Sequence, residues 1–406
     1  MHGVGGDPSP PRRPGMLIAD LTPETAGTSG VSGTSASPGD LDHATVAALA
    51  DGERGAMDGR RSLSVPLADA LTRAGFPRHF VPVEHGGTAG TFGALLDSVA
   101  GVGETCASTA WVAALYAAHG RLASYLPRAG RDDLWRDTPD TRIAASVIPP
   151  RGEAVPEPDG WRLTGDWTLA SGVDHAEWVL LASRTPGEGE AGHRVFAVPR
   201  ERVSVSDTWN SVGLRGTGSN SVSVTGEFVP AHRTFTLADL GQVRPGAARC
   251  HRVPYAMVAS LMFAAPALGS ARGALRDWRA RMMTKVRADG RPALTGGAAQ
   301  QLMARASAQI HSARLLLHQA AWQADHAEVT PLAVASNRRD AALAVELCSG
   351  AVDSLWRAMG ASGLAEGDPV QRRWHDIAAV ASHAAVSFEP AAEAYTRAAL
   401  EAEGLA

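Results

Sequence analysis

Lysine is almost absent from this chain, which limits what the chain is suited to bind. Of its 406 residues only Lys285 is a lysine, so arginine makes up nearly all of the 38 basic residues. Against 42 acidic residues this gives a formal net charge of −4. No excess of positive charge therefore favours nucleic-acid binding. The arginine bias, together with abundant alanine, fits a GC-rich genome better than a function.

Cysteine is scarce as well. Cys106, Cys250 and Cys348 are far apart and odd in number, with no CxxC pair. A reducing cytoplasm is therefore expected rather than a disulfide framework. The first residues lack the continuous apolar stretch of a secretory signal, which favours the same compartment. No HExxH pattern occurs, and His375 and His383 stand eight residues apart, so no metal site is expected.

Long apolar runs are limited to one. Val253–Ala271 is nearly uncharged, lies between Arg252 and Arg272, and is about as long as a membrane-spanning helix. It is rich in alanine and is interrupted by Pro266. We therefore expect a buried helix of a large soluble bundle and no membrane association.

Phosphate-binding glycine loops are missing too. Gly101-Val-Gly103 lies within a helical stretch, and the glycines of Leu214–Asn220 precede a strand-like segment rather than a helix. A Rossmann-type site for NAD(P)H is therefore not expected. What the chain does have is 14 histidines, and histidine is the side chain best suited to proton transfer near neutral pH.

The first third of the chain divides into a tail and a helical unit. Residues 1–40 are rich in Gly, Ser, Thr and Pro and are expected to form a disordered tail. Residues 41–140 have helical periodicity. They include Leu63–Ala74, which should end at Gly75, and Leu95–Leu126, with a break near residues 104–108.

The remainder predicts a β domain followed by a helical bundle. Residues 141–237 predict an antiparallel, barrel-like unit with strands over Ile143–Val147, Gly160–Ala170, Trp178–Ser183, His193–Pro199, Val203–Ser206 and Ser219–Phe228. Residues 238–406 predict an antiparallel four-helix bundle with helices over Ala259–Ala288, Gly297–Ala327, Pro331–Met359 and Gln371–Glu403. The predicted fold class is therefore α+β, mainly α.

Several short strings follow one another in order along residues 60–400. They are Ala74-Gly75-Phe76 with Val81–Gly87, Cys106–Trp111 with His119, Ala144–Gly152, Gly165–Gly172, Asp207–Ser219, Phe228-Val229-Pro230, Gly360–Leu364, and Arg372–Asp376 with His383. With these strings the chain resembles the acyl-CoA dehydrogenase fold. Within that fold it resembles the flavin-dependent monooxygenases that are oxygenase components of two-component systems, such as phenol hydroxylases and nitrososynthases.

The resemblance implies a flavin held between the β domain and the bundle. Ser171, six residues after Gly165, would lie beside flavin N5, where its hydroxyl can donate a hydrogen bond and tune the cofactor. Ser146 would occupy the matching loop on the other side of the ring. Trp167 would either wall the flavin site or pack in the core.

The residue at the position of the dehydrogenase base separates two activities. Acyl-CoA dehydrogenases commonly carry their glutamate base just beyond the string that corresponds to Arg372–Asp376. In this chain residues 378–385 contain no acid, and Glu389 comes six residues after His383. The resemblance puts His383 in that place, as in the phenol-hydroxylating relatives. There a histidine can accept a phenolic proton or donate to the oxygenated flavin. By position alone, a helix-surface histidine hydrogen-bonded to a neighbour is the more common case, and the surrounding strings favour the active-site role.

Further assignments also rest on the resemblance. His119, on a helix that faces the substrate in the family, is expected to be either a substrate contact or a structural residue. Arg287, Gly360 and Gly363 are expected to approach the cofactor of a neighbouring subunit, with a solvated charge as the alternative for Arg287. These features imply an oligomer formed through the bundles, usually a homotetramer. His375 replaces the arginine of the family's Trp-Arg-Asp string and is expected to be structural.

The resemblance thus predicts a cytoplasmic monooxygenase that receives reduced FAD or FMN from a separate NAD(P)H:flavin reductase and reacts with O2. Through a flavin C4a-hydroperoxide, protected in a dry pocket, it would hydroxylate or N-oxygenate a small organic substrate. The candidates are a phenol, a polyketide aromatic, an indole or an amino sugar, in aromatic catabolism or in secondary metabolism such as antibiotic biosynthesis. Two alternatives stay open: an acyl-CoA dehydrogenase with a relocated base, and a non-catalytic helical assembly protein.

Overall fold

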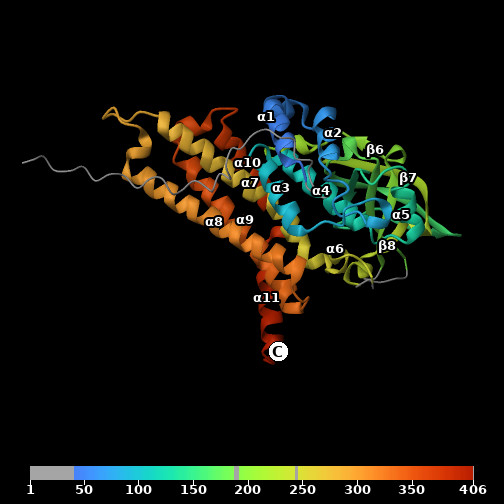
Figure 1. Ribbon diagram of the computed structural model, residues 1–406. Helices are drawn as coiled ribbons and strands as arrows, with labels where there is room; N and C mark the ends of the chain where they lie inside the picture. The colour runs from blue at the N-terminus through green and yellow to red at the C-terminus, as the bar shows by residue number, and fades with distance from the viewer. Residues whose placement is uncertain (1–40, 187–191, 243–245, 406) are drawn as a thin grey trace, which may run out of the picture. The chain divides into compact units, whose positions relative to one another are not determined.

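The computed structural model describes residues 41–186, 192–242 and 246–405. The tail expected over residues 1–40 lies outside these ranges. The described residues form one compact unit. Within it the predicted order of helices, sheet and helices is confirmed (Figure 1).

The helices before the sheet are α1 (His43–Arg60), α2 (Val65–Arg73), α3 (Phe92–Gly103), α4 (Ala107–Ala123) and α5 (Arg128–Leu134). Helix α2 begins where the Ser64 hydroxyl accepts a hydrogen bond from the Leu67 backbone N–H at 3.1 Å. It ends just before Gly75, whose φ of 87° suits glycine. The break between α3 and α4 falls at residues 104–106, so both predicted helix boundaries are confirmed.

The described residues form an eight-stranded sheet in the order β6-β7-β3-β2-β4-β5-β8, with β1 paired to β4. The strands are β1 (Ile143–Ser146), β2 (Glu153–Glu157), β3 (Gly160–Ala170), β4 (Trp178–Arg184), β5 (His193–Pro199), β6 (Ser204–Ser206), β7 (Asn220–Pro230) and β8 (Thr234–Thr236). All the predicted strands are present, and β2 and β8 are additional. The sheet is mixed rather than purely antiparallel, because β1 and β4 run parallel.

The helices after the sheet are α6 (Arg249–Arg252), α7 (Tyr255–Thr284), α8 (Gly297–His326), α9 (Pro331–Arg357), α10 (Pro369–Ala381) and α11 (Phe388–Ala402). Figure 1 shows α7, α8 and α9 side by side, and they pack against one another. The predicted fourth helix is in fact two, α10 and α11, separated at residues 382–387. Pro390 accounts for the interruption, since in a continuous helix its ring would clash with the Val386 carbonyl. His383 therefore lies in a loop.

The helices that precede the sheet in sequence and the helices that follow it share one hydrophobic core. Leu96 of α3 and Trp111 of α4 belong to the same cluster of packed side chains as Leu268 of α7. The sheet has a cluster of its own that contains Trp167. The predicted domain limits near residues 140 and 237 stay a prediction, and the packing joins the first and last of these units.

Helix α7 contains most of the long apolar segment. Among the described helices it alone is long and apolar enough to cross a membrane, yet 78% of its apolar window is buried inside the protein. Gly269 lets it approach α3 closely, because a Cβ there would lie 2.2 Å from the Ala100 carbonyl oxygen. The prediction of a buried bundle helix is confirmed.

Candidate active site

The end of β3 places Ser171 where the sheet meets the helices. The side chain is buried, and the following residue, Gly172, has a φ of 73°, a left-handed turn that suits glycine. The Tyr116 hydroxyl donates to the Gly172 carbonyl at 2.8 Å. Helix α4 therefore holds the turn that carries Ser171.

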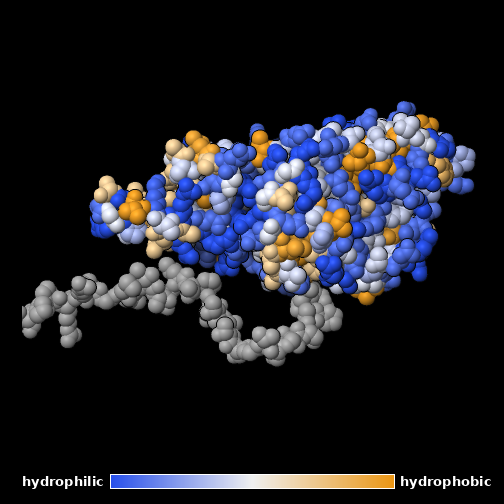
Figure 2. Space-filling model, turned by 90° about the horizontal axis from the view of Figure 1, so that it is seen from above, coloured by the Kyte–Doolittle hydropathy of each residue, from blue (hydrophilic) through white to orange (hydrophobic). Residues whose placement is uncertain are grey.

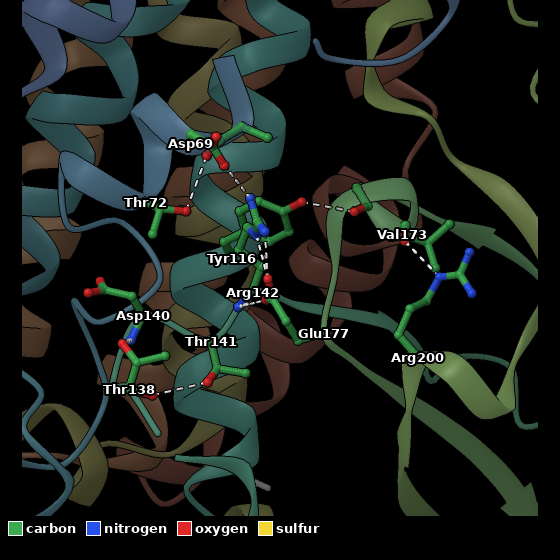
Figure 3. A network of polar contacts seen from close by, with 12 residues as sticks. Asp69, Thr72, Tyr116, Thr138, Asp140, Thr141, Arg142, Val173, Glu177 and Arg200 are labelled. Carbon is green, nitrogen blue, oxygen red and sulfur yellow. Dashed lines mark hydrogen bonds and ion pairs between the residues drawn. The ribbon is translucent and has the colours of Figure 1, made fainter. Parts of the chain in front are cut away.

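A network of ion pairs next to Tyr116 ties the sheet to the N-terminal helices (Figure 3). Arg142, just before β1, lies 3.1 Å from Asp69 of α2 and 2.6 Å from Glu177, just before β4. Burial raises the pKa of Tyr116, so its hydroxyl stays protonated and remains a donor to Gly172. The network fixes α2, α4 and two strands relative to one another.

Trp111 connects Ser171 to two aromatic side chains of the C-terminal half. Its indole Nε1 donates to the Ser171 hydroxyl at 3.2 Å. Its ring centroid lies 5.2 Å from that of Phe263 on α7 and 5.6 Å, edge-on, from that of His383. Phe263 and His383 stack at 4.1 Å. We call Trp111, Phe263 and His383 the aromatic cluster, and it brings α4, α7 and the loop between α10 and α11 to the end of β3.

The His383 ring is held in one tautomer. Its Nδ1 accepts a hydrogen bond from the Ala385 backbone N–H at 3.2 Å. Burial lowers the pKa of His383 to about 4, so the ring is neutral at pH 7. A neutral imidazole with a lone pair at Nδ1 carries its hydrogen at Nε2. His383 thus offers an N–H donor from Nε2.

His119 is held in the opposite tautomer. Its Nδ1 lies 2.7 Å from the Ile143 carbonyl oxygen, and because a carbonyl only accepts, Nδ1 carries the hydrogen. Burial lowers the pKa of His119 to about 4. Its Nε2 is therefore a lone-pair acceptor at pH 7. The same contact ties α4 to β1, so His119 also has a structural role.

Neither Trp111 nor Phe263 is a candidate on sequence alone. The string Cys106–Trp111 is the available signal for Trp111. Phe263 lies within the apolar segment of α7, and no pattern distinguishes it from its neighbours. The fold, and not the sequence, identifies both.

Ser146 and Trp167 flank the irregular end of β3. Ser146 donates its hydroxyl hydrogen to the Thr168 carbonyl at 2.8 Å, which places it near Ser171. Trp167 is fully buried in the sheet's own core, and its Nε1 donates to the Ala182 carbonyl at 2.8 Å. The full burial of Trp167 favours the core-packing alternative, and its flavin-wall role stays a prediction.

Arg287 lies in the exposed turn between α7 and α8, 3.5 Å from the carboxylate of Asp289. Figure 1 shows this turn at the end of the long helices that lies away from the sheet. The chain does not bring Arg287 to Ser171. Its expected contact with the cofactor of a neighbouring subunit stays a prediction.

Gly360 and Gly363 lie in the short helix η9 (Gly360–Leu364), which contacts the same end of α7. Arg281 donates to the Ser362 carbonyl of η9 at 3.4 Å. Arg281 is 18 residues along α7 from Phe263, which corresponds to about 27 Å of helix. The two glycines are therefore remote from the aromatic cluster of their own chain, and their role toward a partner subunit also stays a prediction.

A buried carboxylate supports the loop that faces Ser171. Asp376 of α10 accepts a hydrogen bond from the Leu214 backbone N–H at 2.7 Å. Burial raises the pKa of Asp376 to about 6. Next to it, Gly213 packs so closely that a Cβ there would lie 2.0 Å from the His375 carbonyl oxygen. The string ending in Asp376 therefore holds the 213–219 loop in place.

The surroundings of Ser171 suit a flavin. An isoalloxazine ring needs apolar surface for its faces and hydrogen-bonding groups along its edge. Leu169 and Ile148 are 62% and 67% exposed and lie within two residues of Ser171 and Ser146. Apolar surface therefore flanks two hydroxyl groups, a combination that matches the ring. The described residues contain no group of three or more His, Cys, Asp or Glu arranged for a metal ion.

Comparison with known proteins supports the same interpretation. A family model described as acyl-CoA dehydrogenase, C-terminal domain, matches residues 261–388. The chain is 31% identical to the oxygenase subunit HsaA of a flavin-dependent monooxygenase from Rhodococcus jostii, over 78% of this chain and 86% of that protein. It is 30% identical to the oxygenase component of an FADH2-dependent resorcinol hydroxylase from a Rhizobium species, over 79% of this chain and 83% of that protein. XiaF from a Streptomyces species, solved in complex with FADH2 and glycerol, matches with a TM-score of 0.83 at 26% identity, over 88% and 93% of the two chains.

Proposed function

The chain belongs to the flavin-dependent monooxygenases built on the acyl-CoA dehydrogenase fold, and we propose that it oxygenates a small aromatic substrate, with a phenol favoured. As in its family, reduced flavin and O2 are the cosubstrates. The bound reduced flavin supplies the electrons that activate O2. The chain's own residues bind and orient the reactants and place the protons.

The observation that carries this proposal is the bridging position of Trp111. Its indole touches both the Ser171 hydroxyl, 3.2 Å away, and the ring of His383, 5.6 Å away between centroids. A candidate cofactor contact and a candidate catalytic residue therefore belong to one site, although they are far apart in sequence. Phe263 and Trp111 supply the apolar, water-poor surroundings that protect an activated oxygen species.

The two histidines are suited to opposite hydrogen-bonding roles. His119 offers an unprotonated Nε2, the form that accepts a hydrogen bond from a phenol. His383 offers an Nε2–H, the form that donates a hydrogen bond to oxygen. Of the two roles that the resemblance implies for His383, we therefore propose the donor role, and we propose that His119 accepts a hydrogen bond from the substrate hydroxyl.

The dehydrogenase alternative is less well supported. It requires a carboxylate base next to the flavin, and residues 378–385 around His383 contain no acid. Glu389, the nearest acid after His383 in sequence, is exposed in the first turn of α11. The relatives described above are oxygenase components, which also speaks against a non-catalytic assembly protein.

An oxygen-consumption assay tests the function. Purified protein is mixed with FAD or FMN, a flavin reductase and NADH, and phenolic, indolic and amino-sugar substrates are compared. We expect O2 uptake coupled to a hydroxylated aromatic product, and no bleaching of bound flavin by acyl-CoA. Flavin reduction by acyl-CoA without O2 insertion would instead support the dehydrogenase.

Assembly and location form part of the proposal. We propose a homotetramer that works in the cytoplasm beside a separate NAD(P)H:flavin reductase, with neither membrane nor nucleic acid as a partner. Leu315 and Trp322 of α8 are 52% and 54% exposed, and Figure 2 shows apolar patches within a largely hydrophilic face. Burial of such side chains between bundles would stabilise a tetramer. Light scattering coupled to size exclusion measures its mass.

A further inference from the structure

A line of buried hydroxyl groups leads away from Ser171. The Ser171 Oγ lies 2.7 Å from the Ser219 Oγ, which lies 2.6 Å from the Thr217 Oγ1. The Thr217 Oγ1 lies 2.9 Å from the Leu214 carbonyl oxygen. At the other end, the Nε1 of Trp111 lies 3.2 Å from the Ser171 Oγ. We call Ser171, Ser219 and Thr217 the hydroxyl relay.

Only one orientation of the hydroxyl hydrogens places a hydrogen in every contact of the relay, and we call this orientation the direction of the relay. The Leu214 carbonyl only accepts, so Thr217 donates to it. Each hydroxyl has a single hydrogen, so Thr217 must accept from Ser219, and Ser219 must accept from Ser171. Ser171 in turn accepts from Trp111. In the reverse direction the Thr217 and Leu214 oxygens would face each other at 2.9 Å with no hydrogen between them.

The end of the relay is firmly held. The Leu214 carbonyl also accepts from the Nε1 of Trp209 at 3.0 Å. The Leu214 backbone N–H donates to the buried carboxylate of Asp376 at 2.7 Å. The Thr217 carbonyl accepts from the Gly172 backbone N–H at 2.8 Å, which fixes the spacing between the loop and the Ser171 turn. The direction of the relay is therefore built into the loop.

This direction leaves Ser171 without a hydrogen to donate and with one lone pair to spare. A reduced flavin carries a hydrogen at N5, whereas an oxidised flavin has only a lone pair there. We propose that the relay makes Ser171 an acceptor that favours reduced over oxidised flavin, with Ser219 and Thr217 as positioning residues. The proposal rests on the proposed function, in which Ser171 faces N5, and it reverses the donor role that the resemblance implies for Ser171.

Two substitutions release the Ser171 hydrogen in different ways. Ser219→Ala removes the group that accepts it. Thr217→Val leaves the Ser219 hydrogen free to turn toward Ser171, which again frees the Ser171 hydrogen. Either variant can then donate to the N5 of an oxidised flavin. A neutral hydrogen bond of this kind corresponds to about a 3- to 10-fold gain in affinity.

The experiment measures dissociation constants for oxidised FAD and FMN by fluorescence and for the dithionite-reduced forms by anaerobic titration. We expect both variants to bind oxidised flavin about 3- to 10-fold more tightly and reduced flavin as the parent protein does. Ser221→Ala is the matched control, since it removes a hydroxyl two residues beyond Ser219, in β7 and outside the relay. Ser171→Ala should weaken the binding of reduced flavin only.

Loss of a merely structural contact would weaken the binding of both forms, so tighter binding of the oxidised form is diagnostic. If both variants remain folded by circular dichroism and bind oxidised flavin no better than the parent, the relay proposal is overturned while the proposed function stands. If the parent protein binds neither form of flavin, the proposed function fails as well. The two failures are therefore distinguishable.

Discussion

Trp111 donates its indole hydrogen to the hydroxyl of Ser171 across 3.2 Å, although the two residues are 60 positions apart in sequence. The bond links the helix that carries His119 to the strand end proposed to face the flavin. In this bond the Ser171 oxygen accepts a hydrogen bond from Trp111, while the Ser171 hydroxyl directs its own hydrogen toward Ser219. A single indole group therefore couples the helical side of the site to the sheet side.

His383→Ala should lower product formation by about 100-fold or more, since a positioned hydrogen-bond donor to developing negative charge contributes on that scale. Reduced flavin should still bind, because His383 packs on Phe263 and Trp111 rather than on Ser171. The measurement is product yield per NADH oxidised, with free peroxide assayed alongside. His383→Gln, which keeps an N–H, should recover part of the activity.

His311→Ala is the control for that series, because His311 is exposed on α8 and should not affect turnover. Unchanged turnover in His383→Ala would remove this residue from the mechanism.

The low pKa of His119, about 4 against an ordinary 6.5, makes stability depend on pH. Below pH 6.5 the unfolded chain binds a proton that the folded chain excludes, so the unfolding free energy falls as the pH drops toward 4. His119→Gln still has an N–H for the Ile143 carbonyl and does not titrate. Its loss of stability between pH 6.5 and 4.5 should be shallower, by up to about 1.4 kcal/mol per pH unit. Urea unfolding at several pH values measures the slope, and equal slopes would contradict the assignment.

Asp376 should have the opposite pH dependence. Its pKa is raised to about 6 by burial, so its contribution to stability is present below pH 3.8 and is lost as the pH rises through 6. Asp376→Asn keeps an oxygen for the Leu214 N–H and stays neutral. We expect this variant to be more stable than the parent by about 1–3 kcal/mol at pH 8, and equally stable near pH 4. Lower stability at pH 8 would mean that nearby arginines stabilise the ionised carboxylate instead.

Trp167→Phe tests the assignment of this residue to the sheet core. The change removes a ring from a filled core and leaves the Ala182 carbonyl without its indole donor, so unfolding should become easier by about 2–3 kcal/mol. The flavin dissociation constants of the folded variant should match those of the parent protein. A selective loss of flavin binding at full stability would restore Trp167 to the cofactor site.

Much of the fold follows from local sequence patterns. The strand over Gly160–Ala170 and the helix stop at Gly75 were predictable because alternation and glycine act over a few residues. The buried helix within Val253–Ala271 was predictable for the same reason. Pro390 also marks the break between α10 and α11 in the sequence. The surrounding alanines favour a helix, however, and therefore make the break hard to predict.

The chemistry of the site was less predictable, because it depends on distant partners. The tautomer of His119 is set by the Ile143 carbonyl, 24 residues away, and the direction of the relay by the Leu214 carbonyl, 43 residues after Ser171. From the sequence, Trp167 could be assigned either to packing or to the flavin. The structure adds that its side chain is fully buried in the sheet core. Sequence strings identified the neighbourhood of the site, and the proposed roles rest on hydrogen-bond partners that the sequence does not show.

The core shared by the first and last helices has a consequence for biosynthesis. Every residue of α4 is buried in the finished protein, yet α7, its main packing partner in the later part of the chain, begins 148 residues after α4 begins. At about 5–20 residues per second, the ribosome needs about 7–30 s to supply it. During that interval the nascent chain exposes an apolar helix with no completed core. Fragments ending before Tyr255 should therefore aggregate or recruit chaperones, even though they contain the entire sheet.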